Sequence, residues 1–219
     1  MTQNPATRPV IAVVGAGPNI RRQWLAASTY TTGIEIYFGP STARYYIIDL
    51  RTESDAISSF SKIKHEFGPV SVLVYNNGAR RVNGRSILRR INPLGTFWAT
   101  KFTLPNRLAE TKGTILFTGA TGSLRGSAGL SSFSPGKFGL RSLAQIMMPE
   151  YQAKGIHVAH LAIDGPVDGK LIRGWTRRKW VMQPNEVAGI YLYLHTQPRS
   201  TWTQEIDLRA QKESIFSKL

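Results

Sequence analysis

Short apolar runs of strand length recur along the chain, and segments with helical spacing separate most of them. The predicted strands are Pro9–Val14, Gly33–Phe38, Tyr45–Leu50, Val70–Tyr75, Gly113–Gly119, Ile156–Ile163 and Thr201–Leu208. Apolar residues three or four positions apart predict helices at Arg22–Thr29, Ala56–Phe67, Thr96–Leu108, from Phe133 towards Gly155, and at Pro184–Leu194. This order predicts an α/β fold: a Rossmann-like doubly wound parallel sheet with helices on both faces.

One connection in this pattern is too short. Parallel neighbours need a crossover of about a dozen residues or more. Only Pro40 to Arg44 separate the second and third predicted strands. We therefore expect the crossover helix between them to be missing. The basic segment Arg80–Ile91 also looks shortened, and an excision in the gene model would give the same picture.

Length and composition indicate one folded domain. The chain has 219 residues, of which 42% are hydrophobic and 19% charged. We expect a single domain over residues 1–219, with 1–8 and 210–219 as tails. No apolar run approaches the roughly 18 residues that a membrane-spanning helix needs, and Met1–Pro9 lacks a signal core. The absence of cysteine excludes disulfides and thiolate chemistry.

The formal net charge is +15, from 28 Lys and Arg against 13 Asp and Glu. The excess gathers in Arg80, Arg81, Arg85, Arg89, Arg90 and the segment Arg173–Lys179. Such a surface attracts anions, including phosphorylated cofactors and anionic substrates. No nucleic-acid-binding motif accompanies the charge, so we expect no specific nucleic-acid partner.

The first strand leads into a glycine turn and then a helix. Gly15, Gly17 and Asn19 occupy this turn, which is typical of the entrance to a dinucleotide-binding fold. Further on, Gly113–Gly119 is followed by a loop of small residues and by Phe133-Ser-Pro-Gly-Lys137 at a helix start. An open α/β sheet builds its site at such carboxyl ends of strands.

These motifs, in this order, resemble those of short-chain dehydrogenases/reductases. The family's Gly-x-x-x-Gly-x-Gly turn begins at Gly15, with Asn19 and Arg21 at the second and third glycine positions. Its Asn-Ala-Gly signature matches Asn76-Asn77-Gly78, its Asn-x-x-Gly motif matches Asn92-Pro93-Leu94-Gly95, and its Tyr-x-x-x-Lys pair matches Phe133 and Lys137. The chain particularly resembles an atypical subgroup that has Phe in place of the tyrosine and ends in a stretch like His195–Glu205.

The resemblance implies NAD or NADP as cofactor. The positions that it assigns to cofactor binding are Gly15, Gly17, Asn19, Ile20, Asp49, Leu50, Asn76, Gly78, Lys137 and Gly165. Asp49 has a second interpretation, as part of the cap of the helix that follows, and the two stay open. No acidic residue follows Phe38, so the choice between NAD and NADP stays open as well.

The resemblance also implies a catalytic set that this chain only partly retains. Lys137 and Asn92 match the family's lysine and relay asparagine, whereas Phe133 and Ala120 replace its tyrosine and serine. Phenylalanine cannot exchange a proton, and general acid–base catalysis contributes typically about 10²–10⁴-fold. Asp164 is a second candidate acid/base, and the hydroxyls of Thr118, Thr121 and Ser123 lie nearby in sequence without matching the family's spacing.

Three functional hypotheses therefore stay open. The chain is an atypical oxidoreductase acting on a small carbonyl or alcohol, a non-redox enzyme such as a cyclase, isomerase or dehydratase, or a catalytically inactive or truncated relative. The family implies homo-oligomers formed through the helices Thr96–Leu108 and Lys137–Tyr151.

Two smaller features complete the predictions. His157 and His160 are three residues apart, so a strand would point them to opposite faces, and we expect no metal pair. The final Ser217-Lys218-Leu219 matches a peroxisomal import signal, which predicts an import receptor as partner if the source is eukaryotic, and a cytoplasmic location otherwise.

Overall fold

The computed structural model describes residues 10–14, 52–76, 87–131, 133–168 and 181–211. Their elements are β1 (Val10–Val14), α2 (Glu53–Phe67), β2 (Val70–Tyr75), α3 (Ile87–Glu110), β3 (Gly113–Ala120), the short 3₁₀ helix η2 (Thr121–Ser123), α4 (Ser134–Gln152), β4 (Ile156–Asp164), α5 (Pro184–Thr196) and β5 (Glu205–Arg209).

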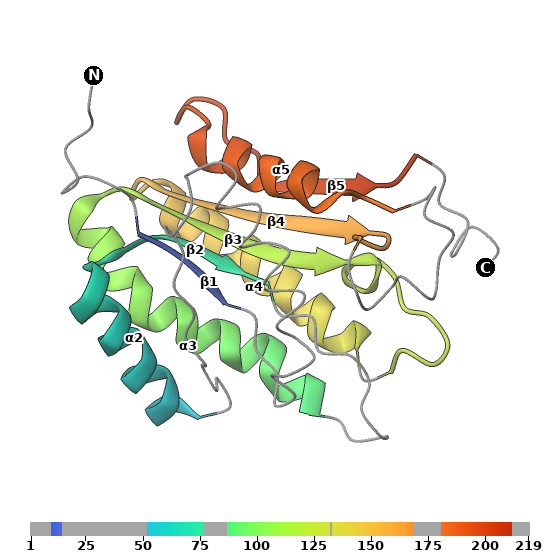
Figure 1. The fold of residues 1–219 in the computed structure, drawn as a ribbon, viewed down its shortest axis with the longest axis horizontal. Helices are drawn as coiled ribbons and strands as arrows, with labels where there is room; N and C mark the ends of the chain where they lie inside the picture. The colour runs from blue at the N-terminus through green and yellow to red at the C-terminus, as the bar shows by residue number, and fades with distance from the viewer. Residues whose placement is uncertain (1–9, 15–51, 77–86, 132, 169–180, 212–219) are drawn as a thin grey trace.

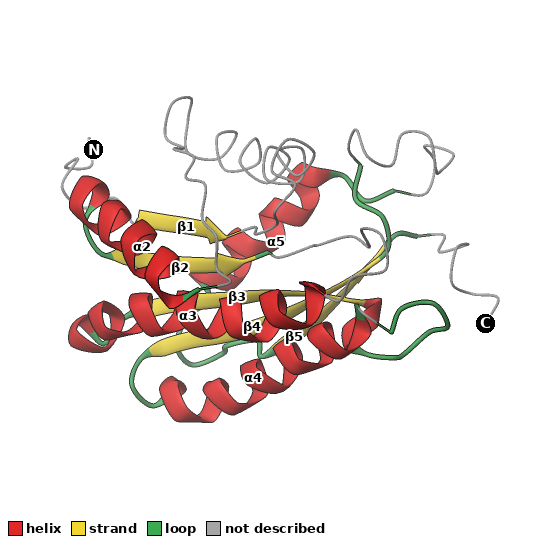
Figure 2. Cartoon of the chain, turned by 90° about the horizontal axis from the view of Figure 1, so that it is seen from below, coloured by secondary structure: helices red, strands yellow, loops and turns green. Residues whose placement is uncertain are grey.

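The five strands form one parallel sheet in the order β1-β2-β3-β4-β5. Helices α2, α3 and α4 cover one face of this sheet and α5 covers the other (Figures 1 and 2). Each parallel connection between neighbouring strands therefore passes through helices, as parallel pairing requires. The prediction of an α/β fold with a parallel sheet between helices is confirmed.

Alternating side chains of each strand fill two separate cores. On β4, Val158 packs towards α2, α3 and α4, whereas Ala159 and Leu161 pack towards α5. Tyr75 and Phe117 belong to the first core and are fully buried. Every residue of β4 is buried, as expected for a parallel strand covered on both faces.

Most element boundaries lie within a few residues of the prediction. Helix α2 begins three residues earlier than predicted, because the Thr52 hydroxyl accepts a hydrogen bond from the Asp55 backbone N–H and caps the helix. Strand β5 begins later than predicted, at Glu205, because the residues before it form a turn. Helix α4 ends at Gln152, just before Gly155, whose φ of 79° suits glycine.

Helix α3 differs more from its prediction. It begins at Ile87 rather than Thr96, and it continues through Pro105, where we expected a kink or restart. Its packing against α2, α4 and β2 stabilises it beyond its local pattern. The helix therefore takes in part of the basic segment, including the backbone of Asn92.

Several predictions fall outside the described residues. They concern the glycine turn, the second and third predicted strands with their missing crossover helix, Asp49, Leu50, Gly78, the segment Arg173–Lys179 and the terminal Ser217-Lys218-Leu219. Among the helices that the structure does describe, none combines the length and the apolar character needed to cross a bilayer.

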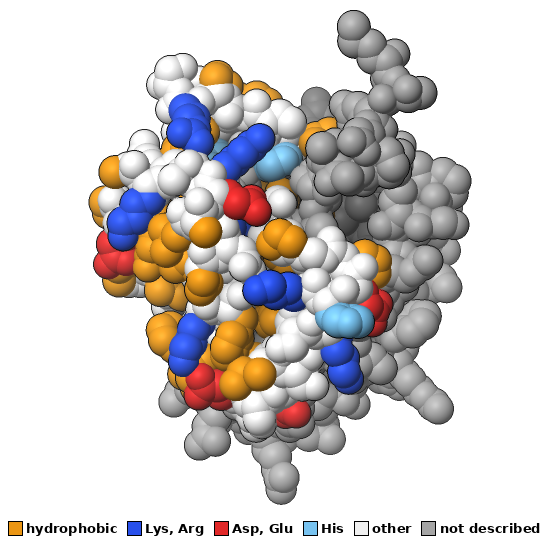
Figure 3. Space-filling model, turned by 90° about the vertical axis from the view of Figure 1, so that its left-hand side faces the viewer, with side chains coloured by type: hydrophobic (Ala, Val, Ile, Leu, Met, Phe, Trp, Pro, Cys, Tyr) orange, Lys and Arg blue, Asp and Glu red, His pale blue; other side chains and the backbone are white. Residues whose placement is uncertain are grey.

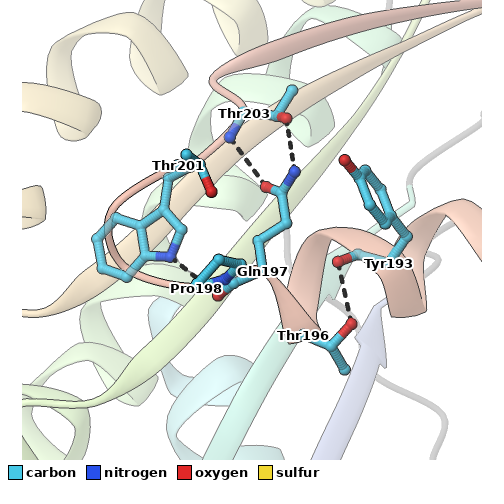
Figure 4. Close-up of a pocket in the computed structure, with 7 residues that line it drawn as sticks. Tyr193, Thr196, Gln197, Pro198, Thr201 and Thr203 are labelled. Atoms are coloured by element: carbon cyan, nitrogen blue, oxygen red, sulfur yellow. Dashed lines mark hydrogen bonds between the residues drawn. The ribbon is translucent and has the colours of Figure 1, made fainter.

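Hydrogen bonds between its two ends, and from His157 of β4, hold the turn between α5 and β5. The Gln197 amide donates to Thr203 Oγ1 (2.8 Å) and accepts from the Thr203 backbone N–H (2.9 Å), as Figure 4 shows. The His157 ring nitrogens lie 3.0 Å from Leu194 O and 2.8 Å from Thr203 O. The ring also stacks on Trp202, with centroids 4.9 Å apart. Residues 197–203 therefore hold β5, which lies at the edge of the sheet, against β4.

A cleft of about 440 Å³ lies beside this turn, lined by Tyr193, Thr196, Gln197, Pro198, Thr201, Trp202 and Thr203. Figure 3 looks onto this end of the molecule, where the strands begin. Lys and Arg side chains are scattered over this face among hydrophobic and uncharged groups. On the part of this face that the structure describes, the net positive charge does not form one patch.

Candidate active site

The candidate site lies at the carboxyl ends of β3 and β4, beside the start of α4. Strand β3 ends at Ala120 and passes into η2, and the loop then leads to Phe133, which precedes the first residue of α4. Pro135 lies in the first turn of α4, where its missing N–H leaves no helical hydrogen bond unmade. The local sequence thus begins the helix at the point that brings Lys137 back onto β3.

Lys137 is buried, with 2% of its surface exposed. Its ammonium Nζ donates a hydrogen bond to Thr118 O at 2.7 Å and lies 5.9 Å from the centroid of the Phe133 ring. Burial lowers the pKa of Lys137 from 10.5 to about 7, because desolvation disfavours the charged form. Near neutral pH this amine can therefore either give or take a proton.

Phe133 and Ala120 carry no hydroxyl groups at the two positions where the resemblance implies a tyrosine and a serine. The Phe133 ring packs on Gly122 so closely that a Cβ there would lie 2.8 Å from Phe133 Cε1. The backbone N–H of Ala120 donates to Ser123 Oγ at 3.1 Å. A glycine at 122 is therefore the residue that makes room for the phenyl ring.

The three nearby hydroxyls have different environments. Thr118 Oγ1 lies 2.6 Å from the Tyr191 hydroxyl, on the face of the sheet that α5 covers. Ser123 is fully buried. Thr121 is half-buried and donates to Asp164 Oδ1. Thr121 is thus the most accessible of the three.

Asp164, the second predicted acid/base, is the last residue of β4 and is fully buried. Besides the bond from Thr121, its Oδ2 lies 3.0 Å from Arg209 Nη2, an ion pair without hydrogen-bond alignment. The same Arg209 nitrogen lies 2.8 Å from Asp207 Oδ2. Asp164 therefore connects the carboxyl ends of three strands. It is the last residue of β4, it accepts from Thr121 directly after β3, and it pairs with Arg209 at the end of β5.

The predicted cofactor positions are described only in part. The Asn76 backbone N–H donates to Val14 O at 2.7 Å, so the ends of β2 and β1 lie side by side. Gly165 has a φ of 152° and is half-buried beside Met182. Gly15, Gly17, Asn19, Ile20, Asp49, Leu50 and Gly78 lie outside the described residues, as does the side chain of Asn92.

The two histidines of β4 point to opposite faces, which confirms the prediction from their spacing. His157 bonds to α5 and the turn after it, whereas His160 lies against Gly119 and Ser123. No group of metal-binding side chains occurs within the described ranges. Sequence reasoning considered Ser123 as a nearby hydroxyl but did not associate His160 or Arg209 with the site. The alternation of side chains along β4 could have placed His160 on the face of the sheet opposite to His157, which is also the face of Gly119.

Comparison with known proteins identifies relatives of the whole arrangement. Residues 31–173 match the model of the short chain dehydrogenase family. Retinol dehydrogenase 10-A of Danio rerio is 27% identical over 146 residues, which cover 61% of this chain but only 42% of that protein. This chain thus spans less than half the length of that relative.

Solved structures resemble the chain over nearly its full length. A short-chain dehydrogenase from Rhodopseudomonas palustris is 29% identical, with a TM-score of 0.69 over 92% of this chain and 98% of that one. An alcohol dehydrogenase from Thermococcus sibiricus, complexed with 5-hydroxy-NADP, has a TM-score of 0.73 over 93% and 97% of the two chains. At 16% identity the latter shows the fold alone. The family match covers more than half of the chain, and with the geometry above it establishes that the protein belongs to the short-chain dehydrogenase family.

Proposed function

We propose that the protein is an oxidoreductase that binds NAD or NADP and interconverts a small carbonyl compound and its alcohol, with Lys137 as the proton-transfer group. The observation that carries this proposal is the buried amine of Lys137, whose pKa lies at about 7. A group with a pKa near the working pH is the most effective general acid or base. It would take the part that the missing hydroxyls of Phe133 and Ala120 leave open.

The positions of Asn76 and Lys137 support a nicotinamide cofactor. The adjacent ends of β1 and β2 lead directly into the Gly15 turn and into Asn76, and the Lys137 amine can donate to ribose hydroxyls. With Asp49, Leu50, Gly78 and Gly165, these residues would hold the cofactor. The cofactor would supply or accept the hydride. The names of the matched alcohol and retinol dehydrogenases support a carbonyl or alcohol as the substrate class.

The proton step would use the amine directly. In alcohol oxidation the neutral Lys137 amine takes the hydroxyl proton, and in carbonyl reduction the ammonium gives one to the oxygen. The hydroxyl of Thr121 donates to Asp164, so towards the substrate it would act as a hydrogen-bond acceptor for the hydroxyl of the alcohol. Asn92, the relay residue of the family, would support a water near Lys137.

The direct test is a fluorescence titration of the protein with NADH and with NADPH. We expect saturable binding of one or both, weakened at least about tenfold in Lys137→Ala. Lys101→Ala is the matched control, because that lysine is exposed and pairs with Glu53 on the outer helices. If neither nucleotide binds saturably to the wild-type protein, the proposal is wrong.

A second candidate is an enzyme that needs no nicotinamide, such as a dehydratase or isomerase. The observation that favours it is the bond between Thr121 and the buried Asp164 carboxylate, a hydroxyl and carboxylate pair at the same edge of the sheet. It predicts turnover that persists without nicotinamide and is abolished in Asp164→Asn. Activity retained in that variant would count against it.

Assembly as a homo-oligomer belongs to the same proposal. Leu94 and Phe97 on α3 and Phe138 and Ile146 on α4 are exposed by between 42% and 52%. Burying these apolar side chains against a second copy would stabilise a dimer. Light scattering after size exclusion would detect it, and the double variant Phe97→Ser with Ile146→Ser should be monomeric.

A further inference from the structure

His160 occupies a position between the candidate site and the surface of the protein. In the strand register it stands between Phe117 of β3 and Glu205 of β5. Its side chain points to the face that α4 covers, the same face as Val158. Glu205 is its cross-strand neighbour, and the Glu205 side chain is 33% exposed. His160 therefore stands between β3 and a partly exposed side chain of the edge strand β5.

The absence of a side chain at Gly119 lets the imidazole reach the site. A Cβ on Gly119 would lie 2.2 Å from His160 Nε2 and 2.7 Å from Ser123 Oγ. These two polar atoms thus flank the same point on β3. The Thr118 carbonyl that accepts from Lys137 belongs to the peptide unit joining Thr118 to Gly119. Lys137 thus bonds to the carbonyl of Thr118, and His160 Nε2 lies beside the next residue, Gly119.

The hydrogen bonding of His160 is incomplete. The residue is 1% exposed, and Nε2 has no hydrogen-bond partner among the residues that the structure describes. A buried polar atom left without a partner costs about 1–3 kcal/mol, so such atoms are rare and call for an explanation. One bridging water, or a rotation of the Ser123 hydroxyl, would give Nε2 a hydrogen-bond partner.

Charged groups surround the ring from both packed elements. Lys137 and Arg141 face it from α4, and Glu205 faces it from β5, where Arg141 holds the Glu205 carboxylate with two bonds of 2.8 Å. Burial lowers the pKa of His160 to about 4; the Glu205 charge opposes this shift, and the Arg141 and Lys137 charges add to it. The ring is therefore neutral at pH 7, with one N–H and one lone pair.

We propose that His160 is a relay residue that carries protons between Lys137 and the solvent at Glu205, through Ser123 or one bridging water. The inference rests on the proposed role of Lys137 in proton transfer. When Lys137 has given up its proton, the imidazole donates the proton of one ring nitrogen towards the amine and accepts another from the Glu205 side. The ring ends neutral, and the net change is the transfer of one proton from bulk water to Lys137.

The test follows the exchange of the Lys137 amine hydrogens for deuterium, by NMR of protein labelled with ¹⁵N-lysine and without any nucleotide. We expect His160→Gln, which keeps a polar side chain but has no nitrogen that can take up a proton, to slow this exchange by at least about tenfold. His157→Gln is the matched control, since it removes a buried histidine from the opposite face of the same strand. Its exchange rate should equal that of the wild type.

Equal rates in the wild type and His160→Gln, or equal slowing in both variants, would overturn the relay. Should His160→Gln fail to fold, Glu205→Gln serves in its place, because it keeps a bond to Arg141 at the surface and should slow exchange by about two- to fivefold. The measurement needs no cofactor. A failed nucleotide titration with slowed exchange in His160→Gln would therefore contradict the oxidoreductase proposal while leaving the relay intact.

Discussion

Strand β4 carries two buried histidines three residues apart, and their surroundings differ in one respect. Both ring nitrogens of His157 face backbone carbonyl oxygens, and its ring stacks on Trp202. His160 Nε2 has no partner within the described part of the chain, and its neighbours are Gly119, Ser123 and the charges of Lys137 and Glu205. The first histidine holds an edge strand in place, and the second has an unmet hydrogen bond beside the candidate site.

Arg107 shows that an unmet hydrogen bond alone does not define a site. Its Nη2 also has no partner in the region that the structure describes, and burial lowers its pKa to about 9. Its other nitrogens bond to Ser71 O and Thr103 Oγ1, and its stem packs on Gly113. What distinguishes His160 is the combination of an unmet bond with a nearby titratable group, Lys137, which bonds to the residue before Gly119.

The largest expected effect is on folding stability at His157. His157→Leu removes the N–H that the neutral imidazole donates to one of the two carbonyl oxygens, and it removes the stacking on Trp202, so we expect a loss of about 2–4 kcal/mol in the free energy of unfolding. His160→Leu should cost less than about 1 kcal/mol, because Nε2 has no bond to lose. Urea unfolding monitored by circular dichroism measures both. Equal losses would remove the distinction between the two histidines.

The next effect tests the close approach at Gly119. Gly119→Ala adds a methyl group where only 2.2 Å separates it from His160 Nε2, so we expect a loss of about 1–3 kcal/mol. In a His160→Ala background the same change should cost less, because the opposing ring is gone and only the approach to Ser123 Oγ remains. The double-mutant cycle from urea unfolding gives the coupling. Additive losses would contradict the described contact.

The pH dependence of stability sharpens the account of Lys137. Its pKa in the folded protein, about 7, lies below the ordinary 10.5. Between these values the unfolded chain binds a proton that the folded chain does not, so the stability that this group confers rises with pH. From pH 7 to 9 the wild type should gain about 1 kcal/mol per pH unit relative to Lys137→Met. Parallel curves for the two proteins would show that Lys137 is not buried.

The smallest expected effect concerns the absent hydroxyls. The double variant Phe133→Tyr with Ala120→Ser restores both groups at positions that resemble the family's acid and its substrate-orienting serine. We expect roughly tenfold faster reduction of small aldehydes and ketones with NADPH or NADH, and little change in stability. Reduction slower than the wild type would indicate that the phenyl ring itself contributes to the site.

Local pattern predicted the fold better than it predicted the site. The apolar run Val70–Tyr75, interrupted only by Ser71, predicted both ends of β2 correctly. By contrast, the basic residues before Thr96 concealed the first turns of α3, whose stability comes from packing. Strand β5 was predicted too long because Trp202 and Thr203 look like strand residues, yet their polar groups bond to the turn.

The site residues that belong to a sequence motif could be predicted, whereas those that only the pairing of separate strands brings together could not. The motif located Lys137 and identified Phe133 and Ala120 as the positions without hydroxyls. It could not associate Asp164 with Arg209, because only the pairing of β4 with β5 brings them together. His160 was considered as a metal ligand alone. Its contact with Gly119 depends on the register between β3 and β4.

One measurement tests the central claim, that the carboxyl ends of the strands form a nucleotide site around Lys137. The ¹³Cε resonance of Lys137 is followed in protein labelled with ¹³C-lysine while NADPH or NADH is added, with Lys112, at the opposite end of the sheet before β3, as the internal reference. The account predicts a saturable shift at Lys137 and none at Lys112. An unchanged Lys137 resonance, or shifts of equal size at both lysines, would contradict it.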